Sequence, residues 1–133
     1  MMAVGTELEA KTFPAITRTA IVEYQGASGD FQPIHHDEPF ARSAGYEAPL
    51  VVGMLPAGML TAWAAERFGA QNVRRTRVRF KSMVWPGDVL TAQGRVTDAS
   101  DAQIEVELWA TNQDDAVVVQ AWMTFVVTSA SQP

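Results

Sequence analysis

Both histidines of this 133-residue chain lie in one short stretch, residues 27–40, which reads ASGDFQPIHHDEPF. The same fourteen residues contain three carboxylates, Asp30, Asp37 and Glu38, and two prolines. A carboxylate can accept a proton from a bound water, and an imidazole can give or take a proton near neutral pH. The stretch could therefore hold a general acid/base pair that activates a water molecule.

Two other interpretations of this stretch compete with acid/base chemistry. His, Asp and Glu are metal ligands, but the adjacent His35 and His36 point in different directions and no second histidine cluster could complete a site. The chain has no cysteine, which excludes disulfides, thiolate ligands and a cysteine nucleophile. We therefore expect no metal. In a purely structural interpretation, Asp37 caps a short helix that has Pro39 in its first turn and ends near Gly45.

The composition is that of one globular domain spanning residues 1–133. The chain is 47% hydrophobic and 19% charged, which argues against disorder. Its net charge of −5 argues against general nucleic-acid binding. The first residues, MMAVGTELEAK, lack the features of a signal peptide, and no apolar stretch is long enough to span a membrane. We expect a soluble cytoplasmic protein that binds neither nucleic acid nor membranes.

The order of the elements predicts an α+β fold. Residues 12–16 are expected to form a short strand or extended entry, and a helix should start after Thr17 or Thr19 and end near Gly26. Pro33 disfavours a helical Gln32, so residues 30–35 should be extended or turned. Apolar residues at helical spacing predict one long helix at residues 53–68. Alternation and turn signals predict four antiparallel strands, at residues 73–84, 89–96, 103–111 and 117–127. Gly69 should cap the long helix, around which a curved antiparallel sheet is wrapped.

Residues 27–54, ASGDFQPIHHDEPFARSAGYEAPLVVGM, resemble the signature of the MaoC-like dehydratases, which include the (R)-specific enoyl-CoA hydratases. The family pattern is approximately ASGD, any residue, NPIH, any residue and Asp, then a short helix ending in AG, a proline and HGM. Further along, VRFKSMVWPGDVLTAQGRV resembles the family's strand–PGD–strand segment. The resemblance implies a single MaoC-like hot-dog domain over residues 1–133, in which a curved antiparallel sheet wraps one long central helix.

The resemblance also implies an activity, namely hydration of trans-2-enoyl-CoA to 3-hydroxyacyl-CoA and the reverse dehydration. Asp30 and His35 stand at the family's catalytic spacing, with Asp30 as the general base and His35 orienting the water and shuttling its proton toward C2. The backbone N–H of Gly53, at the start of the long helix, is the candidate that stabilises the thioester oxyanion. No cofactor is expected, because coenzyme A is part of the substrate.

Two residues depart from the family pattern. Gln32 replaces the usual Asn and keeps the side-chain amide, which extends further from the backbone. Val52 replaces the His of HGM and removes a polar side chain beside the expected thioester site. Val52 could accommodate a bulkier acyl group, or it could mark a subunit that works only beside a partner. Met54 lies close enough to the motif to line a substrate tunnel, although a core position is the simpler expectation.

The positive charge of the chain is concentrated, since residues 74–81 hold five of its ten basic residues. Strand alternation places four of them on one face: Arg75, Arg77, Arg79 and Lys81. Because neighbouring like charges repel, an anion that visits this face would explain the pattern, and we expect it to receive the phosphates of an acyl-CoA substrate. The alternative is a solvated face that pairs with nearby acids.

Other functions fit the same resemblance. Hot-dog domains also serve as acyl-CoA thioesterases, and this chain could instead be a subunit of a heteromeric enoyl-CoA hydratase that needs a second hot-dog chain. Domains of this family usually pair so that two sheets join. We therefore expect a homodimer, or a heterodimer with a related hot-dog chain.

Overall fold

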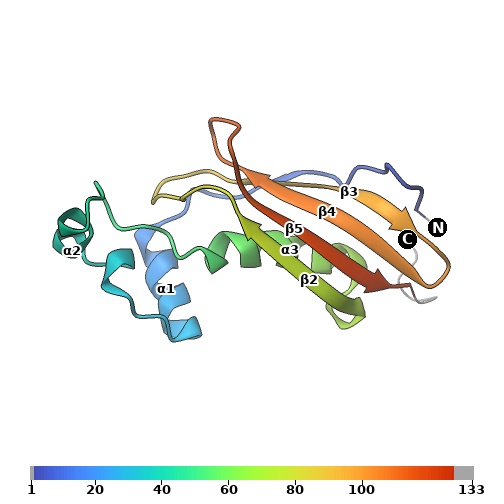
Figure 1. Ribbon diagram of the computed structural model, residues 1–133, viewed down its shortest axis with the longest axis horizontal. Coiled ribbons are helices and arrows are strands. Elements are labelled where there is room, and N and C mark those ends of the chain that lie inside the picture. Colours follow the sequence, from blue (N-terminus) through green and yellow to red (C-terminus); the bar gives the residue numbers. More distant parts are fainter. Residues whose placement is uncertain (1, 128–133) are drawn as a thin grey trace.

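A computed structural model describes residues 2–127 of the chain and contains three helices followed by most of a sheet (Figure 1). The helices are α1 (Arg18–Ser28), α2 (Glu38–Ser43) and α3 (Met54–Phe68). The strands are β1 (Lys11–Thr12), β2 (Val73–Phe80), β3 (Thr91–Ala99), β4 (Gln103–Thr111) and β5 (Val117–Val126). None of the helices in this part of the chain is long and apolar enough to cross a membrane.

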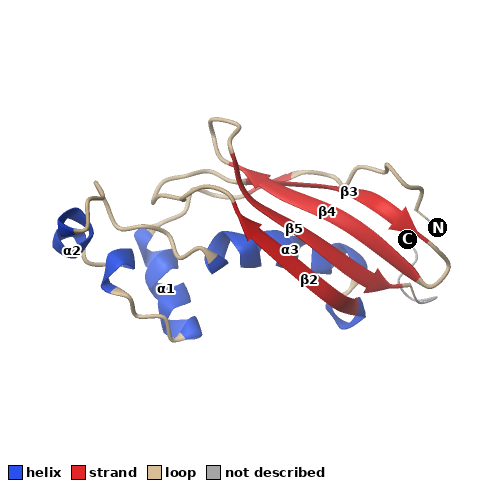
Figure 2. Ribbon diagram, viewed as in Figure 1, coloured by secondary structure: helices blue, strands red, loops and turns tan. Residues whose placement is uncertain are grey.

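The five strands form one antiparallel sheet in the order β1-β3-β4-β5-β2. Helix α3 runs along one face of this sheet and packs against β2, β4 and β5, whereas α1 and α2 lie beyond one end of it (Figure 2). Strand β2 pairs only with β5 and is therefore an edge of the sheet. This is the predicted α+β arrangement of a sheet around one long helix.

Helix α3 owes its position to a stripe of apolar residues. Pro56, Leu60, Ala64 and Phe68 follow one another at intervals of four residues, and all of them are buried. The ring of Phe68 packs on that of Phe125 in β5, with 4.9 Å between their centroids. The helix ends as predicted at Gly69, whose φ of 93° is in the region that favours glycine.

Alternation in the strands supplies the other half of the core. In β5 the buried residues Val119, Ala121, Met123 and Phe125 face α3, and the residues between them face outward. Strand β2 is paired so that Val78 lies opposite Ala121 and Arg77 opposite Trp122. The predicted basic face of β2 is therefore on the outer side of the sheet, away from α3.

Several predicted boundaries differ from the observed ones. Helix α1 continues past Gly26 to Ser28, because Gly29 is the residue that takes the left-handed conformation, with a φ of 75°. The strand predicted at residues 12–16 is limited to β1, and β3 is shifted to Thr91–Ala99. The strand predicted at residues 73–84 ends at Phe80, because the N–H groups of Lys81 and Ser82 both contact the carbonyl oxygen of Val118 and break the regular ladder.

Candidate active site

The loop that carries Asp30 and His35 connects α1 to α2. Thr17 caps α1 as predicted, its Oγ1 accepting a hydrogen bond from the N–H of Ala20 at 3.0 Å. Gly29 ends the helix and turns the chain into Asp30, which is half-buried. The Oδ1 of Asp30 accepts a hydrogen bond from the N–H of Gln32 at 3.2 Å, so the carboxylate also shapes its own loop.

His35 ends a short 3-10 helix, Pro33–His35, and is tied to the segment that precedes α3. Its Nδ1 lies 2.8 Å from the carbonyl oxygen of Leu50. A carbonyl oxygen only accepts hydrogen bonds, so Nδ1 carries the proton and Nε2 of the neutral ring is left as an acceptor. The N–H of Leu50 donates in turn to the carbonyl oxygen of Ile34 at 3.0 Å. This reciprocal pair of contacts fixes the imidazole against residues 50–53.

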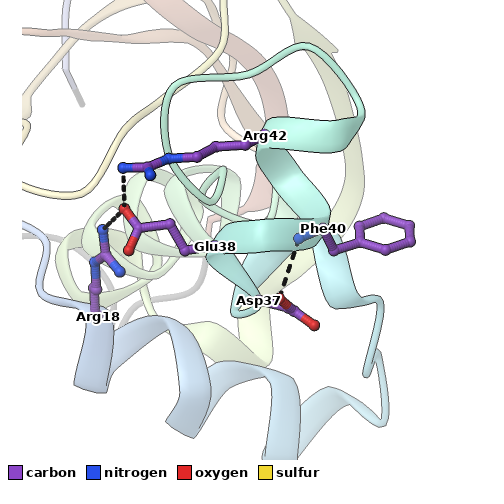
Figure 3. Close-up of polar contacts among 5 residues, drawn as sticks. All are labelled: Arg18, Asp37, Glu38, Phe40 and Arg42. Atoms are coloured by element: carbon purple, nitrogen blue, oxygen red, sulfur yellow. Dashed lines mark hydrogen bonds and ion pairs between the residues drawn. The ribbon is translucent and has the colours of Figure 1, made fainter.

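Helix α2 follows the loop and is attached to α1 by charged side chains (Figure 3). Asp37 caps α2 as predicted, since its Oδ1 accepts from the N–H of Phe40 at 3.1 Å. The Oε1 of Glu38 lies 3.4 Å from guanidinium nitrogens of both Arg18 and Arg42. These pairs are largely exposed and add little stability, but they fix where α2 lies beside the start of α1.

A cavity of about 370 Å³ opens between His35, the start of α3 and the adjoining ends of β2 and β5. His35, Lys81 and Ser82 supply its polar side chains, and most of its remaining wall is apolar, including Phe80, Val84 and Val119. An apolar space with a few polar groups at one side is typical of a small-molecule site. The cavity is large enough for the acyl part of a thioester.

Gly53 lies in the wall of this cavity, directly before the first residue of α3. Among residues 2–127, its N–H takes part in no backbone hydrogen bond. The N–H groups at the start of a helix carry partial positive charge and lack partners within the helix. A Cβ at this position would lie 3.4 Å from the ring of Phe80, which is ordinary van der Waals contact, so a side chain here would fill the space between Gly53 and that ring.

The structure places three of the predicted site residues at the cavity, namely His35, Gly53 and Lys81. Asp30 is on the same loop as His35 but is not one of the residues lining the cavity. Val52 belongs to the hydrophobic core and is only 5% exposed, although its neighbours on both sides line the cavity. The remaining two uncharged candidates, Gln32 and Met54, are exposed and outside the lining.

The predicted basic face is divided between two places. Lys81 contacts the cavity, whereas Arg75 and Arg77 line a separate hollow of about 150 Å³ on the outer face of the sheet. In that hollow the guanidinium of Arg77 lies over the ring of Trp122, 5.1 Å from its centroid. Arg79 is exposed between these two places. In the described part of the chain, no three His, Asp or Glu side chains are grouped closely enough to hold a metal ion.

Gln25 is a residue near the site that the sequence reasoning overlooked. It is 2% exposed, and its side-chain amide contacts three residues of the loop that carries Asp30 and His35. A signal for it was present, because Gln25 follows the buried Ile21 at a spacing of four and so places a polar group on the apolar face of α1. Leu50 and Ser82 were also overlooked, since neither has a local pattern that indicates a site.

Comparison with known proteins assigns this chain to a family. The family model described as MaoC like domain matches residues 2–118. The peroxisomal hydratase-dehydrogenase-epimerase of Neurospora crassa is 30% identical over 98 residues, which is 67% of this chain and 11% of that protein. The (R)-specific enoyl-CoA hydratase of Rhodospirillum rubrum is 33% identical over 85 residues, which is 62% of this chain and 58% of that protein. The chain thus spans less than two thirds of either relative.

The solved structures with the same fold include a chain of the ChsH1-ChsH2 complex from Mycobacterium tuberculosis. It superposes with a TM-score of 0.85 at 24% identity and covers 96% of this chain and 100% of that chain. An identity this low bears on the fold alone. The predicted hot-dog fold is confirmed.

Proposed function

Because this chain belongs to the MaoC-like domain family, we propose that it hydrates trans-2-enoyl-CoA to 3-hydroxyacyl-CoA. The observation that carries this proposal is the fixed tautomer of His35 at the wall of an apolar cavity. With Nδ1–H donated to Leu50, the free Nε2 can hold a water beside the acyl chain. Relatives named as (R)-specific enoyl-CoA hydratases support the same reaction.

The proposed reaction adds one water across the C2–C3 double bond. Asp30 accepts a proton as the water oxygen bonds to C3, and the electron pair of the double bond moves onto the thioester oxygen. The N–H of Gly53 stabilises the negative charge on that oxygen. His35 orients the water, and the proton that Asp30 has taken is passed through Nε2 of His35 to C2, so that Asp30 is a carboxylate again when the thioester carbonyl re-forms. Dehydration follows the same steps in reverse.

For the substrate's carrier, we propose that the basic face of residues 75–81 receives the phosphates of coenzyme A. Lys81 is the first candidate, because it lines the cavity and ends the row of basic residues. Arg79, two residues earlier on the outer face, is the next along the same path. Arg75 and Arg77 are further away along the strand, in the hollow beside Trp122.

An absorbance assay tests the reaction directly. The enoyl absorbance of crotonyl-CoA, and of a longer or branched enoyl-CoA, should fall without release of free thiol. Thiol release without that change would support the alternative, an acyl-CoA thioesterase on the same fold. No change with any of these substrates would contradict hydration by this chain alone and favour a subunit that depends on a partner.

We further propose that the site works in an assembly of two hot-dog chains joined at β2. This strand is an edge of the sheet, and exposed apolar residues continue from it, with Phe80 56% and Met83 52% exposed. Exposed edges with adjoining apolar surface favour pairing with another strand. Phe80 and Met83 also line the cavity, so a partner on this edge would close its open side.

The charge on β2 favours a different chain over a second copy. Consider two copies of the chain joined symmetrically through antiparallel β2 strands, with both α3 helices on the same face of the joined sheet. Residues of β2 that point away from α3 in one copy then lie opposite the same kind of residue in the other copy. Arg75, Arg77 and Arg79 of the two copies would then face one another, which is unfavourable. A related chain with acidic residues opposite Arg75 and Arg77 would pair with them and leave Lys81 and Arg79, which lie nearer the cavity, to the phosphates. The name of the ChsH1-ChsH2 complex, which has two different chains, supports a heteromeric assembly.

A further inference from the structure

Gln25 in α1 is buried and uses its whole side-chain amide on the loop of the candidate site. Its Nε2 lies 2.9 Å from the carbonyl oxygen of Asp30 and 3.2 Å from that of Gln32. Its Oε1 lies 3.2 Å from Nδ1 of His36. Two carbonyl oxygens require a donor, so the NH2 group faces them and Oε1 accepts from Nδ1–H of His36. The chemistry of the partners thus fixes the orientation of the amide.

These contacts hold the loop on both sides of its reactive residues. The bond to Asp30 fixes the backbone from which its carboxylate projects, and the bond to His36 fixes the residue directly after His35. His35 itself is held from the opposite direction by Leu50. Without the side chain of Gln25, the Asp30 end of the loop would keep the cap at Gly29, the bond from the N–H of Asp30 to Oγ of Ser28 at the end of α1, and the bond that the Asp30 carboxylate accepts from Gln32.

We propose that Gln25 is a positioning residue that sets the separation between the Asp30 carboxylate and the His35 imidazole. The inference rests on the proposed hydration, in which these two groups share one water. Such a water must lie within about 2.6–3.2 Å of the group that takes its proton. A displacement of about 1 Å can lower the rate about a hundredfold. Gln25 touches neither substrate nor water and acts through the loop.

The test replaces Gln25 by Met, which has a similar length and no hydrogen-bonding amide. We expect kcat for hydration to fall by roughly ten- to a hundredfold, with KM for the enoyl-CoA within about twofold of the wild-type value. Gln25→Glu is the second variant, because it keeps the size and the acceptor for His36 but turns the donor into an acceptor facing two carbonyl oxygens. It should lose kcat to a similar extent. His36→Ala removes only one of the three anchors and should lose much less.

A double-mutant cycle separates positioning from a general structural role. If Gln25 acts through Asp30, Gln25→Met should lower the residual rate of the Asp30→Asn enzyme far less than it lowers the wild-type rate. Equal losses in both backgrounds would contradict the proposal. Circular dichroism checks that each variant is folded, and if Gln25→Met does not fold, the same cycle is run with Gln25→Glu.

The outcomes distinguish this inference from the proposed function. A wild-type chain that is inactive both alone and together with a second hot-dog chain contradicts the hydration reaction and with it the role of Gln25. An active wild-type enzyme with unchanged kcat in Gln25→Met or Gln25→Glu contradicts the role of Gln25 alone. The ¹⁵N shifts of His36 give a further readout, since Nδ1 should carry the proton in the wild type and lose this preference in Gln25→Met.

Discussion

The imidazole of His35 donates its Nδ1–H to the carbonyl oxygen of Leu50 across 2.8 Å. The adjacent His36 donates its Nδ1–H to Oε1 of Gln25 across 3.2 Å. Gln25 precedes the loop in the chain, whereas Leu50 follows it. The two histidines are therefore held by different parts of the fold, and only His35 lines the cavity. This difference assigns separate roles within the histidine pair.

The first prediction concerns that pair and Asp30. Asp30→Asn and His35→Ala should each lower the turnover number for enoyl-CoA hydration by roughly a hundredfold or more, the usual scale for acid/base groups. Thermal unfolding should show that both variants remain folded, since both side chains are only half-buried. Steady-state kinetics with crotonyl-CoA measure the effect.

His36→Ala is the matched control and should retain most of the activity, because two bonds from Gln25 to the loop remain. An essential His36 together with a dispensable His35 would reverse the assignment.

The second prediction tests the partner expected at β2. Arg75, Arg77 and Arg79 are replaced together by Glu, and the variant is mixed with the wild-type chain. Opposite charges on the joined edges should produce a one-to-one heterodimer, seen by light scattering and native mass spectrometry, that weakens as salt is added. Neither chain alone should dimerise as strongly at the same micromolar concentration.

The control for this experiment changes the same number of charges elsewhere. Lys11→Glu, Arg18→Glu and Arg67→Glu give the same net charge but leave β2 intact, and Lys11 lies on the opposite edge strand, β1. This triple variant should not form the heterodimer. The idea that charge selects the partner would be contradicted if the wild-type chain forms a homodimer at low salt and forms no heterodimer with either triple variant.

The third prediction concerns the carrier of the acyl group. Lys81→Gln should raise KM for enoyl-CoA, more strongly at low salt, because its charge is near the cavity mouth and is screened by ions. The double variant of Arg77 and Arg79 to Gln should act in the same direction. A pantetheine thioester without the nucleotide phosphates should be affected much less. Equal increases for both substrates would mean that these residues support the fold or the assembly.

Arg75→Gln is the internal control for this series. Arg75 lies in the hollow on the outer face of the sheet and not at the cavity, so its effect on KM should be the smallest of the basic residues. A larger effect from Arg75 than from Lys81 would show that the phosphates lie along the strand and not at the cavity mouth.

The fourth prediction compares two glycines by stability. Gly94→Ala places a Cβ 2.7 Å from a methyl carbon of Leu108 and 3.0 Å from one of Leu8, so it should lower the free energy of unfolding by about 1–3 kcal/mol. Gly58→Ala, inside α3, meets no atom within 4 Å and should raise it by about 0.5–1 kcal/mol. Urea titration measures both values, and equal midpoints for the two variants would contradict the close packing of Leu8 and Leu108 on Gly94.

The sequence by itself determined the features that depend on neighbours along the chain. Asp37 caps α2 and Gly69 ends α3 because a side-chain oxygen or a left-handed φ acts within one helical turn. Alternation predicted that Arg75, Arg77 and Arg79 of β2 share a face, since the period of a strand is local. The short motif also placed Asp30 and His35 on one loop, which is why the family could be recognised before the fold was known.

Only the tertiary structure decided which of these residues meet. Leu50 reaches His35 across 15 residues, and Lys81 joins the cavity while Arg75 and Arg77 do not, because β2 loses its regular ladder at Phe80. Val52 is directed into the core although both its neighbours line the cavity. Contacts of this kind depend on how α3 packs against the sheet and on how the loop folds back over α1, which no local pattern encodes. The role of Gln25 belongs to the same class, since its partners are fixed by the loop's path and not by its spacing.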